Sequence, residues 1–169
     1  MADPKIPPHS DEAEVCVLGS LLLDKDAIIQ VADFLLAEHF YKEAHGKIFE
    51  AMVSLYEDRE PIDLVTVADR LKSQKQLKKV GGAAYLTSLT SAVPTAAHIE
   101  QYGRIVKDHF IKRELIRVGT DLAQMAFDEG AATANLMDRA EQLIFGVSQR
   151  HLRQTFIPIK EALAESFDR

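Results

Sequence analysis

The feature that most constrains the fold is a long proline-free stretch in the second half of the chain. From Ala96 to Phe127 there is no Pro, and apolar residues recur at helical spacing. A helix of about 30 residues is about 45 Å long, whereas a preceding head of about 95 residues has an expected diameter of roughly 30 Å. Such a helix is too long to lie wholly on the head, so we expect its distal part to project.

A turn and a second helix follow this stretch. Asp128–Glu129–Gly130 predicts the turn, and the apolar spacing predicts a return helix over Thr133–Arg150, giving an antiparallel hairpin over residues 96–150. Two helices alone bury too little apolar area to hold together, so we expect a second copy of the hairpin to cover the first in a homodimer. The side chains expected to form this dimerisation arm are Leu115, Leu122, Met125, Leu136, Leu143 and Ile144.

The first half of the chain predicts a globular helical head over residues 10–95. A flexible arm with three prolines precedes it over residues 1–9. We expect Ser10 or Asp11 to cap the first helix, with Asp11 and Glu14 forming a capping box. Further helices are predicted over residues 26–36 and 44–56, after Asp63, and after Gly81–Gly82. Because no segment alternates with period two, the predicted fold class is all-α.

Composition narrows the class of protein. Hydrophobic residues make up 47% and charged residues 27%, which is typical of a soluble globular protein. The formal net charge of −6 argues against a dedicated nucleic-acid binder. The single Cys16 cannot form an internal disulfide, no apolar run approaches the roughly 20 residues that span a bilayer, and the start lacks a signal-peptide pattern. We therefore expect a cytoplasmic protein without a membrane partner.

The sequence contains no complete catalytic, phosphate-binding or metal-binding motif among those sought. Gly46–Lys47 resembles the end of a phosphate-binding loop, but Tyr41 stands at the required earlier glycine and Ile48 follows the lysine. No HExxH, CxxC or GxSxG pattern occurs. His39 and His45 flank a predicted helix start and are expected to be cap or surface residues. We predict no catalytic, cofactor-binding or metal-binding residue in this chain.

The C-terminal segment, residues 151–169, predicts a linker followed by a new helix. His151–Thr155 is polar and reads as the linker, and Pro158 suits the first turn of the helix that follows. Little of this chain is left for that helix to pack on, so we expect it to dock on another chain or on a further domain. The residues of its apolar face are Ile159, Leu163 and Phe167.

Several short segments stand out along the chain: Pro7–Pro8, Glu12–Ala13–Glu14, Val17–Leu18–Gly19, Phe40–Tyr41, His45, Pro61–Thr66, Gly81–Gly82, Tyr85–Leu86, Val93–Ala97, Tyr102–Val106 and Leu115–Arg117. Together, in this order and spacing, they resemble the N-terminal domain of the DnaB family of bacterial replicative helicases. The match runs in order from about Pro7 to Arg169, with His98 as one departure where the family has Asn.

The resemblance implies a head, a protruding hairpin and a linker helix that docks on a neighbouring ATPase domain. Six chains would form a trimer-of-dimers collar, and the RecA-like motor domain, which takes ATP and magnesium and makes most of the DNA contacts, is absent from this chain. Such a fragment neither hydrolyses ATP nor unwinds DNA. The implied partner is the C-terminal helicase-binding domain of primase, with a helicase loader as a further candidate. The family's primase-contact positions fall on Glu12, Tyr85, Ile116 and Leu122.

Two alternatives remain open at this stage. One is a helical DNA-binding module that uses the basic residues of the long helix, Arg104, Lys107, Lys112, Arg113 and Arg117. The acidic net charge opposes it. The other is the helicase-binding domain of a primase, which has a similar fold. The PP…EAE…VLG opening and the post-linker helix favour the helicase side.

Overall fold

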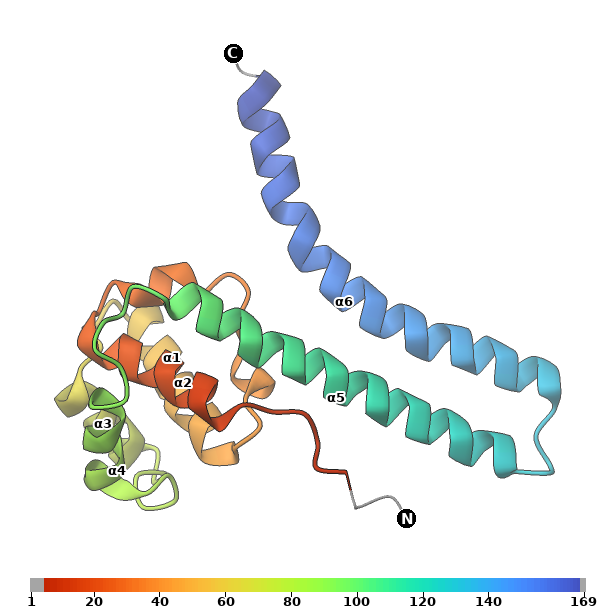
Figure 1. Cartoon of the computed structure of the whole chain (residues 1–169), viewed down its shortest axis with the longest axis horizontal. Helices are drawn as coiled ribbons and strands as arrows, with labels where there is room; N and C mark the ends of the chain where they lie inside the picture. The colour runs from red at the N-terminus through yellow and green to blue at the C-terminus, as the bar shows by residue number, and fades with distance from the viewer. Residues whose placement is uncertain (1–4, 168–169) are drawn as a thin grey trace. The chain divides into compact units, whose positions relative to one another are not determined.

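The computed structural model describes the backbone of residues 5–167 and the side chains of residues 5–151. All regular structure in this range is helical, which confirms the predicted all-α class (Figure 1). The chain divides into two compact units, Met1–Phe110 and Ile111–Arg169, which are described separately below. The elements are α1 (Asp11–Leu23), η1 (Ala27–Gln30), η2 (Ala37–His39), α2 (Glu43–Glu57), α3 (Leu64–Ser73), α4 (Gly82–Thr90), α5 (Ile99–Phe127) and α6 (Thr133–Phe167).

The first unit is a helical head built around one core. Helix α1 packs against α2 and α4, and α3 packs against the same two helices, so the four helices enclose a common interior. The apolar residues at the predicted helical spacings face this interior. The largest fully buried side chains include Leu18, Leu21, Ile48, Phe49, Met52, Leu55, Leu71, Leu86 and Leu89.

Local capping chemistry sets several helix starts, as the sequence predicts. The side chain of Ser10 accepts a hydrogen bond from the backbone N–H of Ala13 at 3.1 Å and so caps α1. Asp63 and Thr66 form a reciprocal capping box at the start of α3. Gly81 has φ of +109°, a left-handed backbone conformation that favours glycine, directly before α4.

The helix predicted over residues 26–36 is wrong. The segment instead contains the short 3₁₀ helix η1 followed by turns, and a second 3₁₀ helix, η2, begins directly after it at Ala37. The apolar residues Ile28, Val31 and Leu35 are still buried, because short 3₁₀ turns bring residues at this spacing to one face as well. No side chain caps η1, and Asp24 accepts the N–H of Asp26 in a local turn that competes with an α-helix.

The head extends further along the chain than the sequence suggested. We expected it to end at residue 95, but the first unit includes the initial turns of α5 up to Phe110. The reason is that Ile99 and Val106 are buried in the same core as α1 to α4. Gly103 lies between them, and a Cβ there would come within 3.1 Å of both Phe34 and Val31, so the absence of a side chain lets α5 approach this closely.

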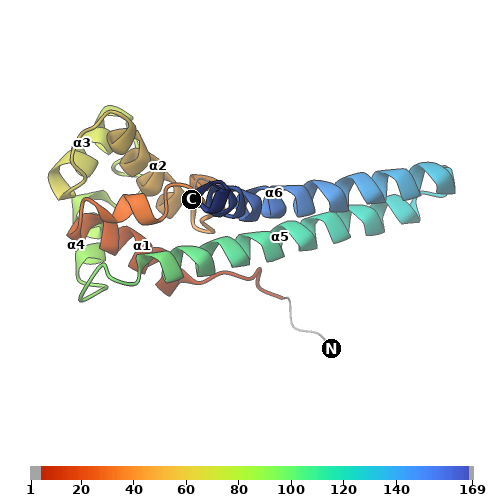
Figure 2. The ribbon, with the colours of Figure 1, turned by 90° about the horizontal axis from the view of Figure 1, so that it is seen from above.

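The second unit is a helical hairpin. The distal part of α5 and the first part of α6 run antiparallel and side by side in both views (Figures 1 and 2). The predicted turn at Asp128–Glu129–Gly130 is confirmed, and the Asp128 carboxylate accepts the backbone N–H of Gly130 at 3.0 Å.

The linker predicted over His151–Thr155 is not a break in secondary structure. Helix α6 continues through it to Phe167, because this stretch contains no Gly or Pro and includes the good helix formers Leu, Arg and Gln. Pro158, expected in a first turn, lies inside that helix. The side chains of Ile159, Leu163 and Phe167 lie outside the described residues, so their docking role stays a prediction.

Candidate partner-binding surfaces

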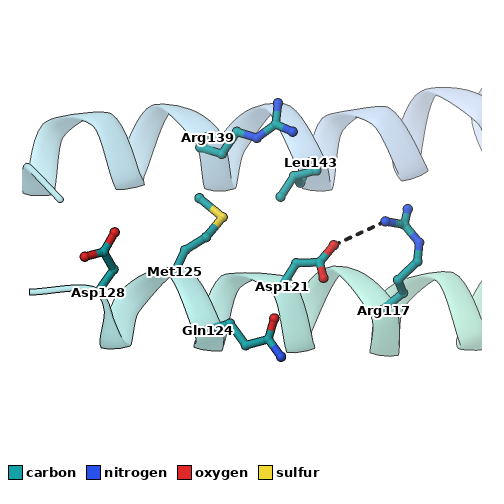
Figure 3. A pocket seen from close by; sticks show the side chains of 7 residues that line it. All are labelled: Arg117, Asp121, Gln124, Met125, Asp128, Arg139 and Leu143. Carbon is teal, nitrogen blue, oxygen red and sulfur yellow. Dashed lines mark hydrogen bonds and ion pairs between the residues drawn. The ribbon is translucent and has the colours of Figure 1, made fainter. Parts of the chain in front are cut away.

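The hairpin has an inner seam of half-buried apolar side chains. Leu122 and Met125 of α5 and Leu136 and Leu143 of α6 belong to it, and in Figure 3 Met125 and Leu143 point toward each other between the helices. Among the described side chains of this unit, Val118 alone is buried, with 3% of its surface exposed. The seam therefore joins the two helices without forming a closed core.

An open pocket of about 450 Å³ lies between the helices near the tip. Within it the guanidinium of Arg117 forms an ion pair with Asp121 at 3.3 Å (Figure 3). Arg117 also pairs with Glu114 at 3.0 Å. Arg117 and Asp121 are about half exposed, and an ion pair that is open to solvent adds little stability. The pocket is lined by Arg117, Asp121, Gln124, Met125, Asp128, Arg139 and Leu143.

A second set of apolar side chains on the hairpin is left exposed to solvent. Each is 50–85% exposed, and large apolar side chains left exposed close together often mark a protein–protein interaction site. We call this set the outer apolar surface: Leu115, Ile116, Phe127, Met137, Ile144 and Phe145. The predicted dimer residues therefore fall into two classes, because Leu115 and Ile144 belong to this surface whereas Leu122, Met125, Leu136 and Leu143 belong to the seam.

The four residues assigned to primase contact lie in different units. Glu12 is exposed in the first turn of α1, and Tyr85 is half-buried near the start of α4, both in the head. Ile116 lies on the outer apolar surface and Leu122 in the seam of the hairpin. All four retain some accessible surface, but the structure of each unit by itself does not bring the two pairs together.

A buried polar network in the head was missed by the sequence reading. The carboxylate of Glu14, only 1% exposed, accepts the backbone N–H of Tyr41 at 2.8 Å and that of Lys42 at 3.3 Å. It also lies 2.8 Å from Nδ1 of His45, whose Nε2 lies 2.5 Å from the hydroxyl of Tyr85. Three helices, α1, α2 and α4, are thus joined through one chain of hydrogen bonds.

This network corrects two expectations. Glu14 does not form a capping box with Asp11, because its carboxylate is turned inward to the start of α2. His45 is fully buried and not a cap or surface residue. His39 is also buried, at 4% exposure, and its Nδ1 accepts the backbone N–H of Leu36, so for His39 the predicted cap is correct but the surface position is not.

Charged side chains lie near the Tyr85 end of this network. Burial raises the pKa of Tyr85, and the charges of Lys42, Asp11 and Glu14 act on the same phenol. Lys42 and Asp11 are themselves paired at 3.3 Å on the surface. Tyr85 therefore presents part of an aromatic ring beside a pair of opposite charges.

The basic residues considered for DNA binding are largely engaged locally. Arg104 forms an ion pair with Glu100 at 2.9 Å and lies 4.7 Å above the ring of Phe34. Lys107 is mostly buried, and burial together with the charge of Arg104 lowers its pKa.

In the described part of the chain, no group of three or more His, Cys, Asp or Glu residues is arranged to hold a metal ion. No helix within that part is both long and apolar enough to cross a membrane.

Comparison with known proteins decides the family. Residues 6–108 match the family model described as the DnaB-like helicase N terminal domain, which covers more than half of the chain. The chain belongs to this family. The resemblance inferred from the sequence motifs is thereby confirmed.

Relatives within the DnaB family match almost the whole chain but only part of their own length. The chain is 43% identical over 164 residues to replicative DNA helicase DnaB of Geobacillus stearothermophilus and 39% identical over the same length to replicative DNA helicase DnaC of Bacillus subtilis. Each match covers 97% of this chain and 36% of the relative. The chain therefore spans about a third of the length of these helicases.

Solved structures of the family have the same fold. The crystal structure of the N-terminal domain of DnaB helicase from Mycobacterium tuberculosis is 41% identical with a TM-score of 0.79, and the match covers 83% of this chain and 99% of that one. A DnaB-like replicative helicase, described with its interactions with primase, is 24% identical with a TM-score of 0.68 and supports the fold alone. That match covers 89% of this chain and 35% of the other.

Proposed function

We propose that this chain is the non-catalytic assembly and partner-docking domain of a hexameric replicative DNA helicase, working in the cytoplasm during chromosome replication. In this role it forms dimers through its hairpin, builds the collar of the ring from three such dimers, and binds primase. The observation that carries the proposal is the outer apolar surface, which a two-helix unit cannot cover by itself. The curated relatives are named as replicative DNA helicases, which supplies the context for that surface.

The energetics favour a second copy of the hairpin as the cover. Complete burial of an aliphatic or aromatic side chain is worth about 1.5–3 kcal/mol, so a residue that is half exposed, such as Ile144, can still gain about 1 kcal/mol. In a two-fold symmetric contact every residue contributes twice. Six residues counted in this way supply roughly 10 kcal/mol, which is of the same order as the about 4–15 kcal/mol that association costs in lost freedom.

Primase is the proposed partner of the assembled collar. Tyr85 and Glu12 offer an aromatic contact with a charged neighbourhood on the head, and Ile116 and Leu122 offer aliphatic contacts on the hairpin. Aromatic and aliphatic anchors surrounded by polar residues are typical of protein interfaces. Primase is chosen because the four positions match those that the family resemblance assigns to primase contact; one structural neighbour, a DnaB-like replicative helicase, is itself described with its interactions with primase. A helicase loader is a further candidate for the same surfaces.

The motor activity is assigned to the part of the helicases that this chain does not span. We propose that the chain itself takes no ATP or magnesium, and that α6 leads toward the motor domain with Ile159, Leu163 and Phe167 docking on a neighbouring subunit. ATP hydrolysis by the purified chain above a buffer control would contradict the non-catalytic assignment.

The assembly proposal is tested by light scattering over a concentration series. We expect the chain to form dimers or larger assemblies of dimers, and Ile144→Asp to weaken the dimer by about 2–4 kcal/mol, since an uncompensated charge replaces an apolar contact twice. This corresponds to a loss in affinity of roughly a hundredfold. Val65→Asp is the matched control, because Val65 is 78% exposed on α3 of the head. A wild-type chain that stays monomeric at high micromolar concentration, or equal effects of both variants, would refute the proposal.

The primase proposal is tested by calorimetry with a primase C-terminal domain. We expect Ile116→Ala to lower the affinity about tenfold and Val65→Ala to leave it within twofold. Because Ile116 also lies on the proposed dimer surface, the mass of each variant is measured in the same buffer. Wild-type chain that releases no heat with the primase domain and does not comigrate with it would remove primase as the partner.

A further inference from the structure

The buried carboxylate of Glu14 accepts its hydrogen bonds from residues outside its own helix. Glu14 belongs to α1, but its two oxygens accept hydrogen bonds from the backbone of Tyr41 and Lys42 and from the ring of His45. A buried carboxylate is tolerated only when such donors replace water. The position of the His45 ring is therefore fixed relative to both α1 and the start of α2.

The bond to Glu14 also fixes which nitrogen of His45 faces Tyr85 as an acceptor. In the tautomer that donates from Nδ1 to the carboxylate, Nε2 keeps a lone pair and serves as the acceptor. The hydroxyl of Tyr85 lies 2.5 Å from Nε2 and donates to it. The direction of the chain is thus Tyr85 to His45 to Glu14.

The Tyr85 ring is held by more than its hydroxyl. It lies nearly parallel to the imidazole of His45, with ring centroids 5.9 Å apart and an angle of 12° between the planes. At its other end it packs on Gly81, where an added Cβ would lie 2.7 Å from Cβ of Tyr85. The ring is therefore held at its Cβ end by Gly81 and at its hydroxyl end by His45, while part of its surface remains exposed.

We propose that Glu14 and His45 are positioning residues that hold Tyr85 as a preordered aromatic contact for an apolar side chain of the primase domain. The proposal rests on the primase-docking function argued above and deepens it by naming what prepares the surface. A contact side chain that is already ordered loses little conformational freedom on binding, which improves affinity without any added contact. The pair of Lys42 and Asp11 forms a polar rim close by.

Two substitutions remove the same hydrogen bond from opposite sides. His45→Asn keeps a donor near the position of Nδ1 for Glu14 but is too short to reach Tyr85. Tyr85→Phe keeps the ring and removes only the hydroxyl. We expect each to lower the affinity for a primase C-terminal domain three- to tenfold in calorimetry, and the double variant to lose no more than the stronger single variant. The matched control is Tyr56→Phe on α2, which should stay within twofold.

A second measurement, made without any partner, separates this inference from the docking function. The ring order parameter of Tyr85, from relaxation of ¹³C-labelled tyrosine, should fall in His45→Asn but not in His39→Gln, which alters a buried histidine elsewhere in the head. Wild-type chain that fails to bind the primase domain would refute the docking function, and the order parameter would still decide the positioning role. An ordered Tyr85 ring in His45→Asn, or single losses that multiply in the double variant, would overturn the inference.

Discussion

The contact between α1 and α4 can be tested at Gly19. A Cβ at this position would lie 2.3 Å from the backbone carbonyl oxygen of Leu89 and 3.4 Å from a methyl group of Val93. A backbone oxygen cannot rotate away as a flexible side chain can, so Gly19→Ala forces the two helices apart by nearly 1 Å. Overpacking of this kind costs about 1–3 kcal/mol, while alanine in place of glycine within a helix returns about 1 kcal/mol. We expect a net loss of up to about 2 kcal/mol in the free energy of unfolding of the head.

The measurement is urea unfolding followed by circular dichroism, together with hydrogen exchange of the α4 amides. Gly119→Ala in α5 is the matched control, because no atom lies within 4 Å of the position of its Cβ. That variant should gain about 0.5–1 kcal/mol from helix propensity alone. A Gly19→Ala variant as stable as wild type, with unchanged exchange in α4, would refute the close-approach reasoning.

Two further predictions concern the head. Asp63→Ala should lower the free energy of unfolding by about 1 kcal/mol in a thermal melt, because it removes the side-chain half of the α3 capping box, whereas Asp63→Asn should retain most of the stability. In the folded chain, Cys16 should react with Ellman's reagent at pH 8 at least tenfold more slowly than a free thiol, since burial and the charge of Glu12 raise its pKa. In urea it should react at the rate of a free thiol. Rapid labelling of native chain would contradict the burial.

Local chemistry explains which parts of the fold could be predicted from the sequence. The start of α3 at Asp63, the start of α4 after Gly81 and the hairpin turn at Gly130 each depend on residues within a few positions of one another. The extent of α5 follows from apolar spacing and the absence of proline. Where the sequence failed, over residues 26–36, the same spacing is compatible with 3₁₀ turns, so periodicity could not distinguish the two.

The polar network could not be predicted, because its members come from distant positions. Glu14 lies 31 residues from His45, and His45 lies 40 residues from Tyr85. An acidic residue in a first turn is ordinarily explained by the helix dipole, and nothing local to Glu14 indicates burial. The one available signal was the strongly apolar surroundings of Glu14, since residues 15–18 contain no charge.

The hairpin shows a different limit of sequence reading. Leu115 and Leu122 lie seven residues apart on the same face of α5, and only the coordinates show that Leu122 is half-buried whereas Leu115 stays exposed. The helix break predicted over residues 151–155 is wrong, because a polar stretch can remain helical when it contains good helix formers such as Leu, Arg and Gln.

The hydrogen bonds that Glu14 accepts from outside its own helix determine what a synthetic copy of the proposed docking surface must contain. Helix α2 has no side-chain cap of its own at Lys42, and the carboxylate that satisfies that backbone N–H is supplied by α1. A synthetic peptide reproducing α4 alone would carry Tyr85 with a freely rotating ring. A minimal mimic of this epitope, whether an inhibitor or a graft onto another scaffold, must therefore include α1 and α2 along with α4.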